Sequence, residues 1–473
     1  MSTRGVELLI VGGGPAGLSA AIEARRHGTE TLLVEERPSV GGQIYKQFPK
    51  EFAVLDAAAL GADHIRAREL IATALSSGAE IMTNTTAWGI WGREVSLSGN
   101  LGAQSIRADQ IILATGSFDR PVAFPGWTLP GVITAGGAQS LTKIQRVLPG
   151  RRVLVAGTGP VALAFAAQLL AAGVRVVEVV EAAPFPGIVG ATNLLRGAVG
   201  NLPRLNQGIG YLRYLRRRGV PFRYSQMIVG VEGTREVERA IVARVDRQWR
   251  PISGTERAIP VDTVCLGYGF SPSTELGRLA GCRHAYSATD GGLVPVREQL
   301  VRSSVSGISI AGDGAGIHGS EQALVEGRLA GIAAARALDH IGAAEAERRT
   351  RAAERRLRSL LRFHRSLTSL YPPGPGVYEL CRGDTIVCRC EEVTAEQILQ
   401  TVDRSGGDPN SVKALTRAGM GRCQGRNCGE QIAAIVARAT NRPVSEVPRL
   451  TIRPPVKPVP LMPALVEGVP EQA

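Results

Sequence analysis

Four of the seven cysteines in this 473-residue chain lie close together near its C-terminus, as Cys388-Arg-Cys390 and Cys423-Gln-Gly-Arg-Asn-Cys428. Four thiolates in one short segment are the usual ligands of a [2Fe–2S] cluster. Structural zinc sites mostly use wider cysteine pairs in both halves, so the tight C-x-C pair disfavours zinc, although zinc and free thiols stay open as alternatives. We predict an electron-transferring cluster held by Cys388, Cys390, Cys423 and Cys428.

The residues around these cysteines predict a small helical domain. Thr394-Ala-Glu-Gln397 is a capping box that opens a helix, and Asp408-Pro409 has the cap-then-proline form of a second helix start. Residues 429–439 predict a third helix, which places Cys428 at a helix N-terminus where the dipole stabilises a thiolate. Three arginines flank the ligands and should offset the negative charge of a cluster: Arg389, Arg422 and Arg426.

A cluster needs a partner that exchanges single electrons, and the N-terminus supplies a candidate site for one. Residues 6–35 have the pattern of a β-α-β unit, and its turn Gly12-x-Gly14-Pro-Ala-Gly17 allows a tight bend and close approach of a pyrophosphate. Glu35 follows Gly12 by 23 residues, where a carboxylate binds ribose hydroxyls. The predicted site comprises Gly12, Gly14, Pro15, Ala16, Gly17, Glu35, Glu36, Gly42 and Gln43.

The same pattern returns in residues 153–181. Its turn is Gly157-Thr-Gly159-Pro-Val-Ala162, and Glu181 ends the second strand. A carboxylate there should repel a 2′-phosphate, so a nicotinamide nucleotide at this site should be NAD rather than NADP. The alternative is a fold that keeps the helix packing while the site is empty or holds another adenine nucleotide. The candidate residues are Gly157, Gly159, Ala162 and Glu181.

Two further apolar segments end in glycine turns: Ile111-Ile-Leu-Ala-Thr-Gly-Ser117 and Gly307-Ile-Ser-Ile-Ala-Gly-Asp313. With them the sequence resembles the flavoprotein superfamily that has two dinucleotide-binding domains and includes the disulfide reductases. The resemblance implies that Thr115, Gly116, Gly312 and Asp313 line an FAD site. A helix over 321–338 would then direct its N-terminal dipole toward the flavin. His318, in the loop before that helix, could touch the flavin ring, but we expect it to be a surface histidine.

The cysteine positions argue against a disulfide reductase. No cysteine lies in the first flavin helix or in residues 136–160, and Cys265 and Cys282 are isolated among apolar or glycine neighbours. We expect both to be buried structural thiols. No catalytic residue is predicted for this chain.

The predicted fold class is α/β, with two Rossmann-like domains of the disulfide-reductase type and a small helical [2Fe–2S] domain at the C-terminus. The predicted domains are a discontinuous FAD-binding domain (1–122 and 288–342), an NAD-type nucleotide-binding domain (123–287), a helical connector (343–384), a [2Fe–2S]-binding domain (385–445) and a proline-rich tail (446–473).

The formal charge of +13 does not indicate nucleic-acid binding, because the arginines are scattered and no basic cluster is interleaved with stacking aromatic residues. The sequence contains no run of about 18 apolar residues, so we predict no membrane-spanning helix. The Arg-rich stretch 348–365 leaves peripheral membrane contact open beside the simpler interpretation of a helix lying on its own domain. An odd cysteine count with four clustered thiols favours the reducing cytoplasm, where the chain could reach the inner face of the membrane through its partners.

A closer resemblance rests on residues 114–132, which include Ala-Thr-Gly-Ser-Phe-Asp-Arg-Pro, together with Thr134-Ala-Gly-Gly137, Gly267-Tyr-Gly-Phe270 and the cysteine module. With these features in one chain, the sequence resembles the α subunits of heteromeric amino-acid and imino-acid dehydrogenases, a group that includes opine oxidase A, hydroxyproline and proline dehydrogenase α, and hydrogen cyanide synthase B subunits. The resemblance covers nearly the whole chain. It implies a flavin-containing β subunit that oxidises the amine, and an α subunit that carries FAD and relays electrons to NAD or a respiratory acceptor.

Two other functions stay open. An intact second fingerprint is also expected of a stand-alone NADH-dependent reductase of an external carrier, and a non-catalytic assembly subunit would hold its nucleotides for structure only. The proline-rich tail, with residues 453–463, is stiff enough to lie along a partner or to wrap its own domain.

Overall fold

The computed structural model describes residues 3–49, 51–52, 62–100, 102–298 and 301–460. The chain divides into two compact units. The first contains residues 1–118, 272–361 and 452–473, and the second contains residues 119–271 and 362–451. Three of the four boundaries between the units fall within elements: β7 (Ser117–Asp119), β16 (Phe270–Pro272) and α9 (Ala343–Thr368).

The first unit is built on a seven-stranded sheet of order β3-β2-β1-β6-β5-β4, with β19 also paired to β6. Strands β3, β2, β1, β6 and β19 are parallel, whereas β4, β5 and β6 form an antiparallel extension. Its elements are β1 (Thr3–Val11), α1 (Pro15–Arg26), β2 (Thr31–Val34), α2 (Ala62–Ser76), β3 (Glu80–Met82), β4 (Thr86–Trp91), β5 (Glu94–Gly99), β6 (Gly102–Leu113), α7 (Glu275–Leu279), β17 (His284–Ser287), β18 (Gly292–Pro295), β19 (Ile308–Ile310), a 3-10 turn (Gly312–Ala315) and α8 (Ser320–Ala337).

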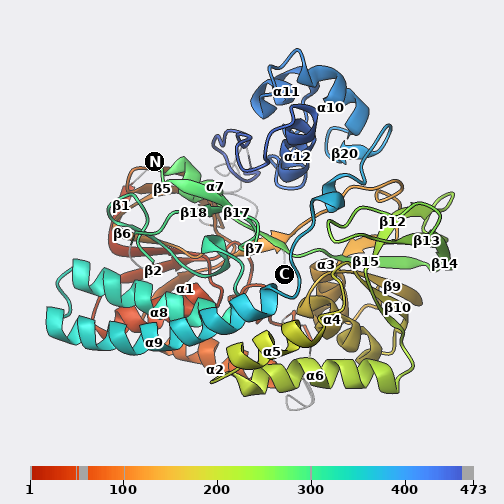
Figure 1. Cartoon of the computed structure of the whole chain (residues 1–473). Helices are drawn as coiled ribbons and strands as arrows, with labels where there is room; N and C mark the ends of the chain where they lie inside the picture. Colours follow the sequence, from red (N-terminus) through yellow and green to blue (C-terminus); the bar gives the residue numbers. More distant parts are fainter. Residues whose placement is uncertain (1–2, 50, 53–61, 101, 299–300, 461–473) are drawn as a thin grey trace. The chain divides into compact units, whose positions relative to one another are not determined.

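Helices α1 and α8 lie side by side against this sheet (Figure 1). Glycines on α8 allow the close approach. A Cβ on Gly327 would come within 2.0 Å of the Ala16 carbonyl oxygen, and one on Gly331 within 2.6 Å of that of Ala20. Because the backbones of the two helices are in contact, the position of the N-terminus of α1 relative to the N-terminus of α8 is fixed.

The second unit contains a parallel five-stranded sheet, β11-β10-β9-β15-β8, and an antiparallel three-stranded sheet, β12-β13-β14. Its elements are β8 (Val132–Thr134), α3 (Ala135–Gln139), a π-helical turn (Ser140–Ile144), β9 (Arg152–Gly157), α4 (Pro160–Ala171), β10 (Arg175–Glu181), α5 (Ile188–Gly197), α6 (Leu202–Arg217), β11 (Phe222–Tyr224), β12 (Gln226–Glu232), β13 (Arg239–Arg244), β14 (Arg257–Pro260), β15 (Thr263–Gly267), a 3-10 turn (Pro375–Tyr378), β20 (Ile386–Cys388), β21 (Val393–Thr394), α10 (Ala395–Val402), α11 (Pro409–Thr416) and α12 (Gly429–Ala439).

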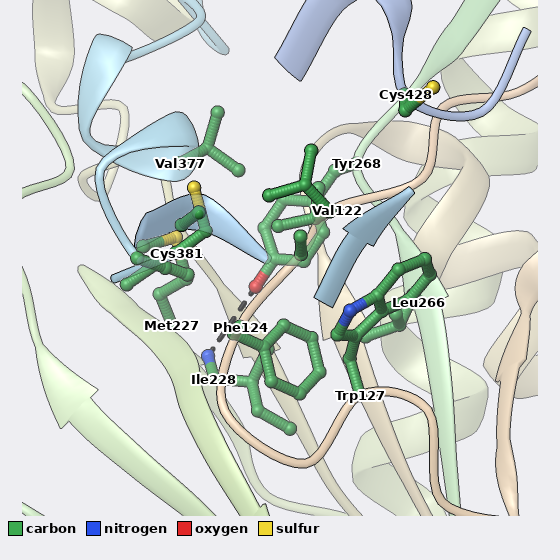
Figure 2. Close-up of a cluster of buried hydrophobic side chains, with 14 of the residues drawn as sticks. Val122, Phe124, Trp127, Met227, Ile228, Leu266, Tyr268, Val377, Cys381 and Cys428 are labelled. Atoms are coloured by element: carbon green, nitrogen blue, oxygen red, sulfur yellow. Dashed lines mark hydrogen bonds between the residues drawn. The ribbon is translucent and has the colours of Figure 1, made fainter. Parts of the chain in front are cut away.

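One continuous hydrophobic core joins the nucleotide-binding fold of this unit to the cysteine module. Phe124 and Leu266 belong to the same buried cluster as Val377 and Cys381, and the cluster extends to Cys428 at the start of α12 (Figure 2). The buried Tyr268 hydroxyl accepts a hydrogen bond from the Ile228 N–H at 3.4 Å. The cysteine module is therefore packed onto this fold rather than attached by a linker alone.

The predicted helices of the cysteine module are confirmed. The Thr394 hydroxyl accepts from the Gln397 N–H, and the Gln397 side chain accepts from the Thr394 N–H, which is the reciprocal capping box that opens α10. Asp408 caps α11 through the N–H groups of Asn410 and Ser411.

The Arg-rich connector helix α9 buries its apolar residues. Leu357, Leu360 and Phe363 are 4 %, 1 % and 6 % exposed, which agrees with a helix that packs on its own fold and leaves this face unavailable to a membrane. Among the described residues no helix has both the length and the hydrophobicity needed to cross a bilayer.

Residues 452–460 of the tail belong to the first unit. Val456 is 2 % exposed and donates its N–H to the Trp88 carbonyl oxygen at 2.9 Å, and Lys457 forms an ion pair with Glu36. Of the two expectations for the tail, this part therefore follows the one in which it packs on its own chain rather than on a partner. Residues 461–473, including Met462 and Pro463, lie outside the described residues.

Candidate cofactor sites

The first glycine turn, between β1 and α1, has no room for side chains. Gly12 has φ +108°, and a Cβ there would come within 2.3 Å of the Ala114 carbonyl oxygen. A Cβ on Gly17 would lie 1.9 Å from the Gly12 carbonyl oxygen. This backbone-to-backbone packing is what a dinucleotide fingerprint requires of its first and third glycines.

The second glycine of the turn, Gly14, caps α1, with Pro15 as the first helical residue. A Cβ added to Gly14 would meet only the Gly42 Cα, at 3.7 Å, so its surroundings leave space for a ligand to approach the helix N-terminus. Gly42 has φ +64° and packs against Gly14. The next residue, Gln43, is exposed.

Glu35 lies buried beside this turn. Its Oε2 accepts a hydrogen bond from the Gly13 N–H at 2.7 Å, and its Oε1 accepts from the Arg37 N–H at 3.0 Å. Burial raises the pKa of this carboxyl, while the two N–H donors oppose that shift. Glu36 points elsewhere, because it is exposed and paired with Lys457.

The structure brings the remaining predicted FAD residues to the same turn. A Cβ on Gly312 would lie 2.9 Å from the Ala16 Cβ, and one on Gly314 would lie 2.9 Å from the Thr115 Oγ1. Gly116, next to Thr115, has φ +67°. The 3-10 turn therefore lies against both the start of α1 and the Thr-Gly turn after β6.

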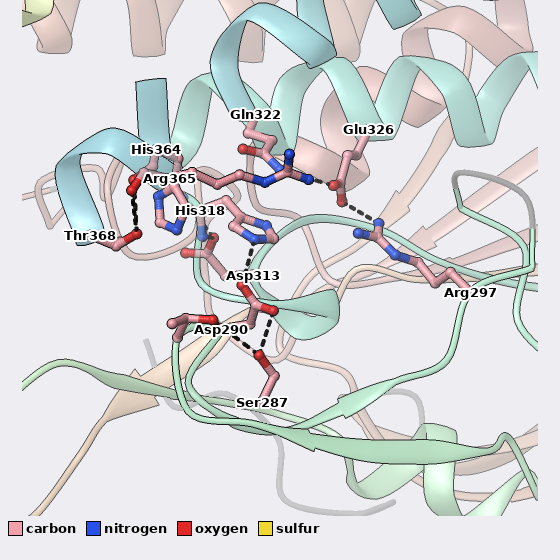
Figure 3. A network of polar contacts seen from close by, with 12 residues as sticks. Ser287, Asp290, Arg297, Asp313, His318, Gln322, Glu326, His364, Arg365 and Thr368 are labelled. Atoms are coloured by element: carbon pink, nitrogen blue, oxygen red, sulfur yellow. Dashed lines mark hydrogen bonds and ion pairs between the residues drawn. The ribbon is translucent and has the colours of Figure 1, made fainter. Parts of the chain in front are cut away.

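Asp313 is held at the start of α8. Its Oδ1 accepts from the N–H groups of His318 and Gly319 at 3.1 and 3.0 Å. Burial raises the pKa of Asp313, and these N–H donors lower it. The expectation of a surface His318 is wrong, because its side chain is only 9 % exposed and its Nε2 lies 3.2 Å from the Asp290 Oδ1 (Figure 3).

A buried ion pair supports the 3-10 turn. Glu326 on α8 accepts from the Gly312 N–H at 2.9 Å and pairs with Arg297 at 2.9 Å (Figure 3). Because Glu326 is 1 % exposed, these contacts satisfy a charge that would otherwise be costly to bury. No sequence signal pointed to this pair.

The second fingerprint repeats the tight packing of its first glycine and the hydrogen bonds of its carboxylate. A Cβ on Gly157 would lie 2.3 Å from the Gly267 carbonyl oxygen, and Gly159, with φ +85°, caps α4, on which Ala162 is buried. Glu181 accepts from the N–H groups of Gly159 and Ala183, both at 2.8 Å. Burial raises the pKa of Glu181 to about 7.

Tyr371, which sequence reasoning missed, lies next to this second turn. Its Cγ would lie 3.9 Å from a Cβ on Gly159, so the ring occupies space beside the glycine at which a pyrophosphate must approach. Burial and the neighbouring Glu181 raise the pKa of the Tyr371 hydroxyl. The second fingerprint is intact, but in this conformation its turn is partly covered by the connector.

The four predicted cluster ligands converge at one end of the cysteine module, and their thiols associate in two pairs. Cys428, at the start of α12, donates a hydrogen bond to Cys388, while Cys390 and Cys423 form the other hydrogen-bonded pair. The Gly419 N–H also donates to the Cys388 sulfur at 3.4 Å. The Cys428 hydrogen bond lowers the pKa of Cys388 to about 6 and raises that of Cys428.

Two pairs of cysteine thiols match the ligand set of a [2Fe–2S] cluster, which takes two cysteines on each iron.

Two of the remaining cysteines are buried away from the cysteine module, and two of the arginines beside the candidate ligands make contacts within it. Cys265 and Cys282 are buried, as expected of structural thiols, and burial raises the pKa of each. Arg389 lies over the Trp127 ring, with its guanidinium carbon 5.9 Å from the centroid, and Arg426 donates to the Cys423 carbonyl oxygen at 3.3 Å.

Comparison with known proteins agrees with these features. Residues 6–337 match the family model described as pyridine nucleotide-disulphide oxidoreductase, and residues 386–438 match the BFD-like [2Fe-2S] binding domain. The chain belongs to the pyridine nucleotide-disulphide oxidoreductase family. These matches imply FAD in the first domain and a [2Fe–2S] cluster in the cysteine module, and they confirm the predicted fold class.

Two curated relatives extend over almost the whole chain. The opine oxidase A subunit of Rhizobium meliloti (strain 1021) is 36% identical over 463 residues, which is 96% of this chain and 97% of the relative. The hydrogen cyanide synthase HcnB subunit of Pseudomonas aeruginosa is 36% identical over 457 residues, with the same coverage. These relatives confirm the resemblance to this group of subunits that was inferred from residues 114–132 and the cysteine module.

Among solved structures, L-proline dehydrogenase from P. horikoshii has the same fold, with a TM-score of 0.68 and 21% identity over 98% of this chain and 80% of that chain. By its family matches the chain is thus a flavin-family oxidoreductase with a BFD-like [2Fe-2S] binding domain.

Proposed function

We propose that this chain is the electron-transferring α subunit of a heteromeric amino-acid or imino-acid dehydrogenase of the hydroxyproline, proline or opine type. The observation that carries the proposal is that one chain holds both a glycine turn built for a dinucleotide and four converging cysteine thiols. It is supported by near full-length relatives that are named as oxidase and synthase subunits. When bound, FAD exchanges electrons singly or in pairs, and the cluster exchanges them singly.

In the first unit, the residues around the glycine turn would hold the FAD. Gly12, Gly14 and Gly17 leave the α1 N-terminus open to the pyrophosphate, and Glu35 offers a carboxylate to the ribose hydroxyls. Asp313 lies at the 3-10 turn, where a carboxylate can accept from the ribityl chain. The N-terminus of α8 would favour negative charge on the ring.

In the second unit, Cys388, Cys390, Cys423 and Cys428 would hold the cluster. Gly421 makes this possible, because a Cβ there would lie 2.2 Å from the Cys390 Cβ. The flanking Arg389, Arg422 and Arg426 would offset the negative charge of the cluster.

We propose that the amine is oxidised on a separate flavin-containing β subunit. The described residues are accounted for by the two nucleotide-binding folds, the connector and the cysteine module, so a fold dedicated to the amine would have to belong to another chain. The odd cysteine count with four clustered thiols favours the cytoplasm, where the terminal acceptor would be NAD or a respiratory carrier.

The intact second fingerprint favours one alternative function, a stand-alone NADH-dependent reductase. The geometry of Gly159 and Glu181 supports NAD there, while the position of Tyr371 beside Gly159 argues for a site that is restricted in this conformation. Another adenine nucleotide could bind there as well, because its ribose hydroxyls would donate to the same Glu181 carboxylate.

A reduction experiment separates these functions. The chain is prepared anaerobically, alone and as a complex with its amine-oxidising flavoprotein subunit, and is mixed with L-proline, 4-hydroxyproline or an opine. The α subunit proposal predicts bleaching by one of these amines only in the complex. Rapid bleaching of the isolated chain by NADH, with none by any amine in the complex, would favour the reductase. No bleaching by any donor would favour an assembly subunit.

A further inference from the structure

Helix α5 and its flanking loops expose an unusual amount of apolar surface. Six large apolar side chains within residues 185–202 are 58 to 85 % exposed: Phe185, Ile188, Val189, Leu195, Val199 and Leu202. Elsewhere in the described residues, large exposed apolar side chains occur singly or in sequence pairs. Because monomeric proteins rarely leave such groups together in water, this α5 surface has the character of an interaction site.

The opposite side of α5 is already packed. A Cβ on Gly190 would lie 2.9 Å from the Leu370 Cδ2, and one on Gly197 would lie 2.2 Å from the Ser366 Oγ. These glycines are seven residues apart and share one helix face, as do Ile188 and Leu195 on the other side. The helix is therefore seated on the end of the connector through small residues while its large apolar residues face outward.

The charged side chains in the sequence around α5 have one sign. No aspartate or glutamate occurs between Glu181 and Glu232, whereas the same stretch contains exposed arginines such as Arg196, Arg213 and Arg216. An exposed apolar segment whose neighbouring charges are all arginines is suited to a protein partner that carries apolar residues and carboxylates.

We propose that the α5 surface docks the flavin-containing, amine-oxidising β subunit, through an apolar patch on that subunit rimmed by carboxylates. This inference rests on the proposed function, because its occupant is the partner proposed there. Near full-length relatives are named as subunits, which argues for a protein occupant. A helix bound to a membrane surface would carry several cations along a polar face, whereas α5 has one charged residue, Arg196.

Two other segments that could have bound a partner, α9 and the tail, bury their apolar residues against other parts of the same chain. The apolar residues of α9 are buried, and Val456 of the tail is buried in the first unit. Among the described residues, the α5 surface is therefore the one that combines exposure, apolar character and uniform charge.

The test uses the full-length chain, affinity-tagged and expressed in its native host, and measures the amine-oxidising flavoprotein subunit recovered with it. The double variant Ile188→Glu/Leu195→Glu should reduce that recovery at least tenfold. The matched control is Ile252→Glu/Leu415→Glu, which alters residues that are 42 % and 57 % exposed in the same unit and should match wild type. Unchanged iron and flavin per chain would show that both variants fold.

A second variant protects the test against local disruption of α5. Arg213→Glu/Arg216→Glu leaves the apolar residues in place and should weaken recovery and reduce its dependence on salt. Equal recovery of the flavoprotein subunit with all variants would overturn the inference.

The remaining outcomes are distinguishable. If the wild-type chain recovers no amine-oxidising flavoprotein subunit, the proposed function fails as well. Two results would overturn the docking inference alone: sedimentation showing a wild-type dimer that Ile188→Glu/Leu195→Glu dissociates, or binding of wild type but not this variant to phosphatidylglycerol vesicles while recovery of the flavoprotein subunit is unchanged.

Discussion

The indole N–H of Trp127 donates a 2.6 Å hydrogen bond to the carbonyl oxygen of Ile386, two residues before the candidate ligand Cys388. Trp127 is 7 % exposed, and Arg389, between the first two candidate ligands, lies over its ring. A residue of the family-specific segment 114–132 therefore anchors the strand that carries the first cysteine. This contact gives a structural reason for the joint occurrence of the two features.

Replacing Trp127 by Phe should keep most of the packing and lose this hydrogen bond. The second unit should become less stable by about 1 kcal/mol, the usual contribution of one buried hydrogen bond. Urea unfolding followed by iron release measures the change. Trp91→Phe, at a position that is 51 % exposed, is the control and should have little effect. Identical unfolding of the two variants would show that the anchor has no energetic role.

Each of the four clustered cysteines should be required for iron. Cys423→Ser or Cys428→Ser should lower iron from about two atoms per chain to a small residue, because the cluster normally requires all four thiolates. Cys282→Ala, a buried cysteine of the first unit, should retain full iron. Iron analysis with visible absorption tests this, and retention of iron without Cys428 would refute the ligand assignment.

Gly12→Ala should abolish FAD binding. The new Cβ would lie 2.3 Å from the Ala114 carbonyl oxygen at a φ that L residues rarely adopt, so the turn cannot keep its shape. Gly5→Ala, in strand β1 before this turn and with open space around it, should bind FAD normally. Flavin per chain is the readout, and iron content reports whether the second unit is intact. Normal flavin in Gly12→Ala would mean that the cofactor lies elsewhere.

Removal of the Tyr371 ring should open the second nucleotide site. Because the ring lies beside Gly159, Tyr371→Ala should bind NAD about tenfold more tightly, since a conformation that covers the turn would no longer compete with the nucleotide. Tyr371→Phe keeps the ring and should behave like wild type. Isothermal titration of each variant with NAD gives the answer. Weaker binding by Tyr371→Ala would instead make this residue a stacking partner of the nucleotide.

Nucleotide affinity at the second site should rise with pH. In the free protein, burial raises the pKa of Glu181 to about 7, and ribose hydroxyls donate to the ionised carboxylate. Below that pH a proton must leave before binding, so affinity should fall by up to about tenfold per pH unit. Titrations from pH 5.5 to 8.5 should show this slope in wild type and none in Glu181→Gln. A flat wild-type profile would remove Glu181 from the site.

Elements whose signal is local could be predicted from the sequence. The helix expected over 429–439 is α12 (Gly429–Ala439), and the helix expected over 321–338 is α8 (Ser320–Ala337). Caps, glycine turns and apolar strands act over a few residues, so their pattern survives folding. The fingerprint glycines were predictable for the same reason, because their spacing encodes backbone contacts.

Contacts between distant segments could not be predicted. Tyr371 precedes a Pro-Pro-Gly-Pro-Gly break and has no local feature that places its ring beside Gly159. The Arg297–Glu326 pair is likewise hidden, since each residue alone has the character of an exposed charge. The outward face of α5 escaped notice because its apolar residues have the pattern of a helix packed in a core.

The most direct test is the cofactor content of the full-length chain purified anaerobically, measured as flavin and iron per chain with the visible spectrum. The proposed electron-transfer function predicts one flavin and about two irons per chain, with iron–sulfur absorption beneath the flavin bands. Zinc in place of iron, or a chain that never carries flavin, would contradict the electron-transfer function.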